Sequence, residues 1–592
     1  MREIGLLRSS EGAIERIRRS VIGDDAMVDG PFGPRRLVYA DYTASGRALS
    51  FIEDYIRERV LPLYANTHTE ASATGLHTTA LREDARRVIH RAVGGSDEDV
   101  VLFCGSGSTS SIDRLIRVLE IHRHDRPVVF IGPYEHHSNE LPWRESGAEV
   151  VTIRESADGR LDLGHLATEL RRRAGHTLKI GSFSAASNVT GIITDVEAVS
   201  ELLRRHGALS CWDYAAAGPY LAIDMNGKDA VFLSPHKFVG GPGTPGVLVA
   251  KRALFSNRVP TVPGGGTVLF VTPDHHTYHP DPSVREEGGT PAIVESIRAG
   301  LVFALKDEVG AEVICRRERD LARRASASWS ENPNIEILGN TSVERLPIIS
   351  LGLRHPPRLL HCNFVVALLN DLFGIQARSG CFCAGPYLHR LYRVDKRWSM
   401  RMEAECRRGH IGAKLGFVRL SFNYFISDEA FEYILEAIHL LADHAWKLLP
   451  LYRFDPYSGL WHHGNYRRAV PTLADVHVPS TTTEPEGTLA RHIEQARQIL
   501  RTVQTAAPYL PASDPAINEL RTDPLVPATK RSADKAKGVS CCLREVISSM
   551  HRPAGAAGSD AGRSPDGLDR RRDRGGDCRG PGEPLHPGRR RR

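Results

Sequence analysis

The chain has 592 residues, and its 41% apolar content is ample for at least one large buried core. No run approaches the roughly 20 apolar residues of a membrane-spanning helix and no signal core starts the chain, so we expect a cytoplasmic protein without a membrane partner. The net charge is +6, but residues 551–592 carry 11 arginines against 6 acidic residues; the remainder is nearly neutral, which argues against a nucleic-acid partner.

The ten cysteines form neither a disulfide framework nor a metal site. Their spacing along this long chain is irregular, unlike the dense pattern of small secreted domains. Only Cys381 with Cys383, and Cys541 with Cys542, lie close together, and neither pair has the Cys-x-x-Cys spacing of zinc ligands. We therefore predict no structural metal.

A large α/β domain is predicted over residues 39–300, after an N-terminal segment at 1–38. From about residue 98, short β-rich runs alternate with amphipathic helical segments, which predicts a mostly parallel central sheet flanked by helices. One such segment, residues 111–120, has apolar residues at the helical spacing i, i+3, i+4 and i+7. Seven strands are predicted, at residues 100–103, 128–131, 150–153, 178–183, 209–212, 230–233 and 246–250.

A smaller α+β domain is predicted over residues 301–450. Helical periodicity after Pro291 and the β-rich runs that follow it indicate this second unit. Its predicted elements are a helix through about residue 307, a helix at 308–332, strands at 346–351 and 418–422, and a closing helix at 428–449.

Residues 451–511 form a predicted C-terminal extension, with an aromatic-rich connector and one helix at 489–505. Beyond about residue 512 the periodicity fades. The last forty residues are rich in Gly, Pro and Arg and cannot bury enough apolar surface to fold. We therefore predict that the segment 512–592 is disordered.

Two polar loops follow the first two predicted strands. Gly105-Ser106-Gly107-Ser108-Thr109 lies between a strand and a helix, where free backbone N–H groups and the helix dipole can bind a phosphate, with Ser108 and Thr109 at the site. The second loop is Glu135-His136-His137-Ser138-Asn139-Glu140. The imidazole of His136 can stack on a planar ring; the alternative is an ordinary polar loop histidine.

Asp213 ends another strand, and the small residues after it leave room for a flat ring. A buried carboxylate needs a cation or good hydrogen bonds, and a protonated pyridine nitrogen is such a cation. The alternative is a helix N-cap, a common role for Asp at a strand-to-helix junction.

Lys237 follows the apolar run 230–233 and enters a glycine-rich turn. A desolvated amine there has a lowered pKa and is the neutral nucleophile that a Schiff base requires. Ser234 and His236 can bond a phosphate. An isolated lysine after a strand is usually a solvated surface residue, but these four sites share the C-terminal edge of one sheet, where open α/β sheets bind ligands. The set predicts bound pyridoxal 5′-phosphate (PLP), with Lys237 as its anchor.

At these residues the chain resembles the class V aminotransferase-like PLP enzymes, and within them the cysteine desulfurases and selenocysteine lyases. The resemblance runs from about Tyr39 to Leu449 and implies fold type I. Its motifs are Tyr39-Ala40-Asp41-Tyr42-Thr43-Ala44-Ser45, the loop of His136, Ser187-Asn188-Val189-Thr190-Gly191, the Asp213 and Lys237 segments, and Arg285-Glu286-Glu287-Gly288-Gly289-Thr290-Pro291. In that family the equivalent of Thr290 reaches the phosphate of the neighbouring subunit's cofactor, which implies a homodimer.

The stretch Arg378-Ser379-Gly380-Cys381-Phe382-Cys383-Ala384-Gly385-Pro386 resembles the loop that bears the nucleophilic cysteine of group II cysteine desulfurases. Its Gly-Cys-Phe-Cys spelling is also similar to the N-terminal domain of molybdenum cofactor sulfurases. Cys383 matches the nucleophile; the alternative is a buried, inert thiol. Flanking glycines indicate a mobile loop, and Arg378 can favour the thiolate.

Arg419 matches the family's arginine for the substrate α-carboxylate, which a guanidinium can bind through two parallel donors; a surface salt bridge is the alternative. Ala216 stands where many members of the family have glutamine, and Ser110 where they often have glutamate. We expect these two departures to affect the choice of substrate more than the binding of the cofactor.

The resemblance implies that L-cysteine, or a related amino acid such as selenocysteine, binds through Arg419 and Asn188 while Lys237 moves the α-proton. Cys383 then takes the sulfur as a persulfide, alanine forms, and the sulfur passes to an acceptor, such as another protein. Alternatives are transamination, lyase chemistry or epimerisation on the same cofactor, and a non-catalytic binding or scaffold protein that retains the fold.

Overall fold

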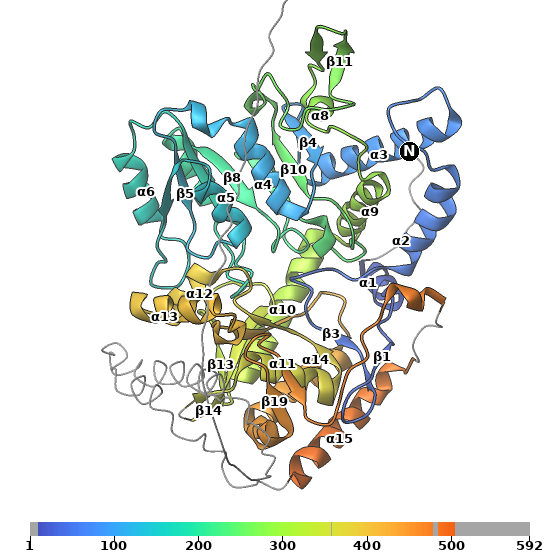
Figure 1. Ribbon diagram of the computed structural model, residues 1–592, viewed down its shortest axis with the longest axis vertical. Coiled ribbons are helices and arrows are strands. Elements are labelled where there is room, and N and C mark those ends of the chain that lie inside the picture. Colours follow the sequence, from blue (N-terminus) through green and yellow to red (C-terminus); the bar gives the residue numbers. More distant parts are fainter. Residues whose placement is uncertain (1–9, 357, 478–482, 504–592) are drawn as a thin grey trace, which may run out of the picture. The chain divides into compact units, whose positions relative to one another are not determined.

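The seven predicted strands form one sheet in the spatial order β4-β10-β9-β8-β7-β5-β6 (Figure 1). Only β10 runs antiparallel to its neighbours, so the predicted mostly parallel sheet is confirmed. The strands are β4 (Asp99–Phe103), β5 (Val128–Ile131), β6 (Glu149–Thr152), β7 (Lys179–Ser184), β8 (Leu209–Asp213), β9 (Ala230–Leu233) and β10 (Val247–Lys251).

The structure is a computed structural model that describes residues 10–356, 358–477 and 483–503. The predicted disordered tail at 512–592 and the last residues of the extension lie outside the described residues. None of the helices in the described ranges could span a lipid bilayer.

Successive residues of each strand point to opposite faces of the sheet, so the same strands build two cores. On one face they pack with Ile112 of α4 (Gly107–Val118) and Trp143 of α5 (Leu141–Arg144). On the other face they pack with Ile89 of α3 (Ala73–Ala92), Leu203 of α7 (Val196–Arg205) and Phe303 of α9 (Ile293–Val309). Burial on both faces explains why these strands read as near-continuous apolar runs.

Several other elements precede α9 in the chain. Figure 1 labels the hairpin of β11 (Val268–Val271) and β12 (His276–Tyr278) by its first strand. The remaining elements are α1 (Ser10–Ser20), β1 (Met27–Val28), β2 (Arg35–Arg36), β3 (Val38–Tyr39), α2 (Ser50–Tyr55), α6 (Leu163–Arg172) and α8 (Pro282–Arg285).

The smaller unit is an antiparallel sheet in the order β13-β14-β18-β17, covered by helices. Its short strands β13 and β17, three residues each, gave no sequence signal. The elements are α10 (Ala311–Ser330), β13 (Ile335–Ile337), β14 (Ile348–His355), β15 (Arg358–Leu359), α11 (Cys362–Phe373), β16 (Ile375–Gln376), β17 (Arg378–Gly380), α12 (Gly385–Leu391), α13 (Lys396–Arg407), β18 (Phe417–Ser421) and α14 (Asp428–His444).

The helix predicted over 428–449 ends earlier, at His444, and continues as a 3₁₀ segment, Ala445–Leu451. Pro450 has no N–H to donate and disfavours the α conformation in the residue before it, which accounts for the tighter last turns.

The C-terminal extension packs on the smaller unit. A hairpin of β19 (Tyr452–Phe454) and β20 (Trp461–His463) precedes α15 (Leu489–Thr502), which confirms most of the helix predicted at 489–505. Leu489, Ile493 and Leu500 of α15 are buried in the same core as α11 and α14. The strand β3, from the N-terminal part of the chain, pairs with β16 of this unit.

Candidate active site

A cavity of about 510 Å³ opens where strands of the large sheet end and the smaller unit begins. All the predicted site residues except Thr290 line it, although they come from distant parts of the sequence. They are Ser108, Thr109, His136, Asn188, Asp213, Ser234, His236, Lys237, Cys383 and Arg419.

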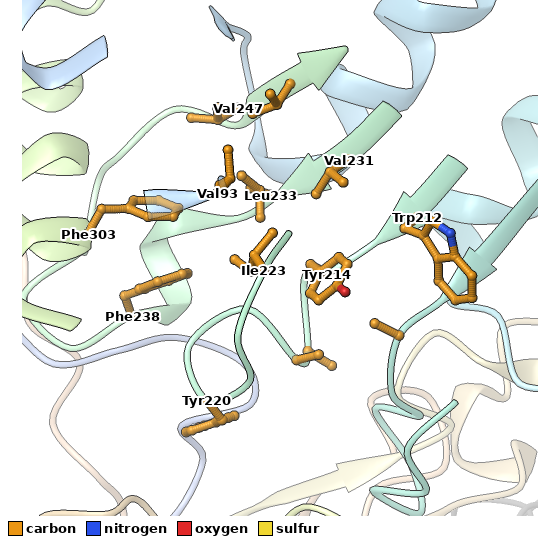
Figure 2. Close-up of a cluster of buried hydrophobic side chains, with 14 of the residues drawn as sticks. Val93, Trp212, Tyr214, Tyr220, Ile223, Val231, Leu233, Phe238, Val247 and Phe303 are labelled. Atoms are coloured by element: carbon orange, nitrogen blue, oxygen red, sulfur yellow. The ribbon is translucent and has the colours of Figure 1, made fainter. Parts of the chain in front are cut away.

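The turn that carries Lys237 is tightly anchored. The ring of Phe238, the next residue, packs on Phe303 of α9 with centroids 4.8 Å apart (Figure 2). On the other side, Gly46 N–H donates to His236 O at 2.8 Å, and a Cβ on Gly46 would lie 1.9 Å from Phe238 O. Glycine at position 46 therefore lets the N-terminal chain press against this turn and fix the direction of Lys237.

Lys237 and Asp213 perturb each other inside the protein. Burial lowers the pKa of Lys237 to about 8, although the nearby Asp213 carboxylate opposes the shift. Lys237 is half-buried and lines the cavity. Burial also raises the pKa of Asp213, which accepts a hydrogen bond from Ala215 N–H at 2.8 Å. The described residues directly after Asp213, 215–220, form turns and no helix, so the N-cap alternative is wrong. A cation in the cavity would stabilise the carboxylate of Asp213.

The glycine-rich loop packs directly on the Lys237 turn. Gly107 has φ +55°, and a Cβ there would lie 3.0 Å from His236 Cε1 and 3.1 Å from Ser234 Oγ. Ser108 N–H donates to Ser234 Oγ at 2.9 Å. Gly107 and Ser108 are the first residues of α4. The N–H groups of its first turn and the hydroxyls of Ser108 and Ser234 therefore lie at one end of the cavity, and together they form a donor set that suits a phosphate.

The two cavity histidines are neutral. Burial lowers the pKa of His136 to about 3, with Lys237 as a second cause. The pKa of His236 falls to about 4 for the same two reasons. A neutral imidazole carries no charge to repel a cationic ring, so His136 can stack on one.

Cys383, and not Cys381, lines the cavity. Its side chain is exposed, so the alternative of a buried, inert thiol is wrong. Cys381 instead packs at the edge of an apolar cluster with Phe382 and Tyr387. The cavity cysteine is therefore the one that matches the nucleophile position of the loop at 378–386.

Arg419 on β18 is 3% exposed, so the alternative of a surface salt bridge is wrong. Its Nη2 donates to Asp41 Oδ1 at 2.8 Å and its Nη1 to Asn188 O at 3.1 Å. The guanidinium lies 4.8 Å from the centroid of the Phe382 ring. Among the described residues, Nε has no hydrogen-bond partner, which leaves a buried donor for an anionic ligand.

Two residues shape this end of the cavity in ways that sequence reasoning missed. Asp41 also pairs with Arg378, with Oδ2 3.2 Å from Nε, so one carboxylate orients two arginines. Asn188, predicted to bind substrate, donates its side-chain N–H to Phe382 O at 2.7 Å. Asp41 stands in the motif at 39–45, but its partner Arg419 is 378 positions away and no local pattern joins them.

Thr290 lies outside this cavity. It is exposed, and Asn66 Nδ2 donates to its hydroxyl at 3.4 Å. The contact of Thr290 with the cofactor of a neighbouring subunit stays a prediction.

A family described as aminotransferase class-V matches residues 38–433. The chain belongs to this family. Class-V aminotransferases are PLP-dependent enzymes, and the family's cofactor chemistry agrees with the donors around Lys237.

Curated relatives of this chain are named as probable cysteine desulfurases. A probable cysteine desulfurase of Streptomyces coelicolor is 29% identical over 363 residues, 59% of this chain and 84% of the relative. Another, from Halalkalibacterium halodurans, is 28% identical over 363 residues, 60% and 85% of the two chains.

Solved structures of cysteine desulfurases have the same fold. The apo enzyme from Thermococcus onnurineus has a TM-score of 0.61 at 24% identity, over 74% of this chain and 99% of its own. CsdA from Escherichia coli has a TM-score of 0.58 at 21% identity, over 72% and 97% of the two chains.

Proposed function

We propose that the cavity binds PLP and that the chain is a cysteine desulfurase, which takes sulfur from L-cysteine, or selenium from selenocysteine, onto Cys383 and forms alanine. One observation carries this proposal: an exposed thiol shares a cavity with a lysine of lowered pKa, a buried carboxylate and a buried arginine with a spare donor.

The residues present fit the cofactor. Ser108, Thr109, Ser234 and His236 supply the donors for its phosphate, and Gly107 lets the backbone approach it closely. His136 would stack on the ring. Asp213 would pair with the protonated ring nitrogen, which stabilises a carboxylate that burial alone disfavours, and Lys237 would anchor the aldehyde carbon.

Bound PLP supplies an electron sink for the substrate α-carbon. Lys237 moves the α-proton, and its lowered pKa keeps part of the amine neutral and basic near pH 7. Arg419 binds the substrate carboxylate through the N–H groups that Asp41 and Asn188 leave free. Asn188 keeps a second amide hydrogen for the same carboxylate.

Cys383 performs the sulfur transfer. Its thiolate attacks the substrate sulfur, an S–S bond forms, and the C–S bond breaks with its electron pair left on the substrate carbon. A proton then completes the methyl group of alanine. The exposed position of Cys383 lets the persulfide pass to an acceptor, for which a small thiol or a sulfur-acceptor protein is the proposed chemistry.

The test uses two variants of the full chain. Cys383→Ser should retain the visible absorbance of bound PLP and lose sulfide and alanine production from L-cysteine, whereas Lys237→Ala should lose borohydride-trapped cofactor. Full activity of Cys383→Ser on an amino acid without sulfur would instead support transamination, lyase chemistry or epimerisation. A protein that stays colourless with added PLP would indicate a non-catalytic binding or scaffold role.

A homodimer and a cytoplasmic location are part of the same proposal. Three successive apolar side chains on β11 are each more than half exposed: Leu269, Phe270 and Val271. Thr290, about 20 positions further along the chain, is also exposed. Such a surface favours a second copy as its cover. Phe270→Asp should convert the dimer to monomer in sedimentation, and Leu163→Asp, on α6, should not. A wild-type monomer would contradict the proposal.

A further inference from the structure

The loop that bears Cys383 has an unfavourable backbone. Phe382 and Cys383 have φ values of +51° and +54°, two consecutive side-chain-bearing residues in the left-handed region. L-residues rarely adopt this conformation, and they keep it only when surrounding contacts impose it. The contacts on this loop therefore decide where the Cys383 thiol lies.

His137 supplies two of those contacts. Its backbone N–H donates to Cys383 O at 2.6 Å, and its ring Nε2 accepts a hydrogen bond from Gly385 N–H at 3.0 Å. Asn188 adds a third through Phe382 O. His137 thus binds the loop on both sides of Ala384, whereas its neighbour His136 lines the cavity.

Two further observations support the hydrogen bond between the Gly385 N–H and the His137 ring. A Cβ on Gly385 would lie 3.2 Å from His137 Nε2, so a larger residue here would push the ring away from this backbone N–H. The contact also requires an unprotonated Nε2. Burial lowers the pKa of His137 below its ordinary value, with Glu140 opposing and Arg144 reinforcing the shift, so the ring is neutral near pH 7.

We propose that His137 is a positioning residue for Cys383: its backbone and ring nitrogen hold residues 381–385 in the strained turn that places the thiol at the cavity. This inference rests on the proposed function for its catalytic consequence. Without the ring contact the loop can relax to extended backbone, which moves the sulfur away from the substrate. Misplacement by about 1 Å can cost roughly 100-fold in rate.

The test compares His137→Leu, which removes the acceptor, with His137→Gln, whose side-chain oxygen can replace Nε2. His389→Leu is the matched control, because His389 is also partly buried and contacts Ser399 instead of the loop. Hydrogen exchange of the Gly385 amide in the full-length protein should be about tenfold faster in His137→Leu and unchanged in the other two. Unchanged exchange in His137→Leu would overturn the proposal.

A single-turnover reaction of PLP-loaded enzyme with L-cysteine tests the catalytic consequence. Persulfide formation on Cys383 should slow about 10- to 100-fold in His137→Leu and recover in His137→Gln, while half-saturation of the cofactor spectral change by L-cysteine stays within about twofold. Gly385→Ala should also slow it by crowding the ring. The proposal would be overturned if His137→Leu and Gly385→Ala both formed the persulfide at the wild-type rate. It would also be overturned if His137→Gln did not recover that rate.

The two failures are distinguishable. If the wild-type protein forms no persulfide from L-cysteine, the proposed function fails, but Gly385 exchange still reports whether His137 holds the loop.

Discussion

Lys237 shows how a single side chain depends on its surroundings. An exposed lysine is protonated at neutral pH, whereas burial lowers the pKa of this one to about 8 in spite of the opposing Asp213 carboxylate. A neutral amine is the form that adds to an aldehyde, so its titration sets the pH at which cofactor is taken up.

We expect the rate of PLP uptake by cofactor-free protein to rise about tenfold per pH unit below pH 8 and to level off above it, because the neutral fraction of Lys237 grows as pH passes its pKa. Stopped-flow absorbance would measure this rate. Lys237→Arg should form no Schiff base with PLP at any pH. A midpoint near 10.5, the ordinary lysine value, would contradict the expected desolvation.

Asp41 is a second residue whose role depends on the fold. Its carboxylate orients Arg419 and Arg378 together, and its backbone forms a bridge with Ser421 on the strand that carries Arg419. We expect Asp41→Asn to raise KM for the amino acid about tenfold with little change in PLP affinity, because the arginine loses its fixed orientation.

Steady-state kinetics and cofactor titration would separate these two effects. Asp54→Asn, in an exposed pair on α2, is the matched control and should change neither. Equal losses of PLP and substrate affinity in Asp41→Asn would indicate general misfolding instead.

At the level of elements, the start of α4 is limited by space. The helix begins at Gly107, where φ is positive and a Cβ would crowd the side chains of His236 and Ser234 at 3.0 and 3.1 Å. The loop and the Lys237 turn therefore pack as one surface against which the phosphate would lie.

Gly107→Ala should lower PLP affinity at least tenfold and cost about 1–2 kcal/mol of unfolding free energy from the left-handed backbone. Gly207→Ala is a matched control: φ is +61°, yet a Cβ at this position would have nothing within 4 Å. Gly207→Ala should lower the free energy of unfolding by a similar amount and leave PLP affinity unchanged. Fluorescence titration and chemical denaturation would measure both quantities, and equal PLP affinity in the two variants would contradict the steric account.

Across the whole molecule, the extension completes the core of the smaller unit. Ile493 of α15 is buried in the cluster formed by α11 and α14, on the sheet that carries Arg419. We expect Ile493→Ala to lower the unfolding free energy by about 2–5 kcal/mol, as other buried large-to-small changes do, and exposed Gln495→Ala to change it by less than about 0.5 kcal/mol. Denaturant unfolding measures both; a neutral Ile493→Ala would mean that the helix adds no stability.

The sequence alone determined the strands of the large sheet, because doubly buried strands require continuous apolar runs and each leaves a local signal. It also selected the Lys237, Asp213, His136 and glycine-loop residues, since each follows a strand and strand ends share one edge.

Only the tertiary structure decided that Asp41 orients Arg419 and that His137 holds the Cys383 loop. These contacts join residues hundreds of positions apart or depend on a strained turn. Neither leaves a periodicity in the sequence, because a hydrogen bond between distant loops constrains geometry without constraining local composition.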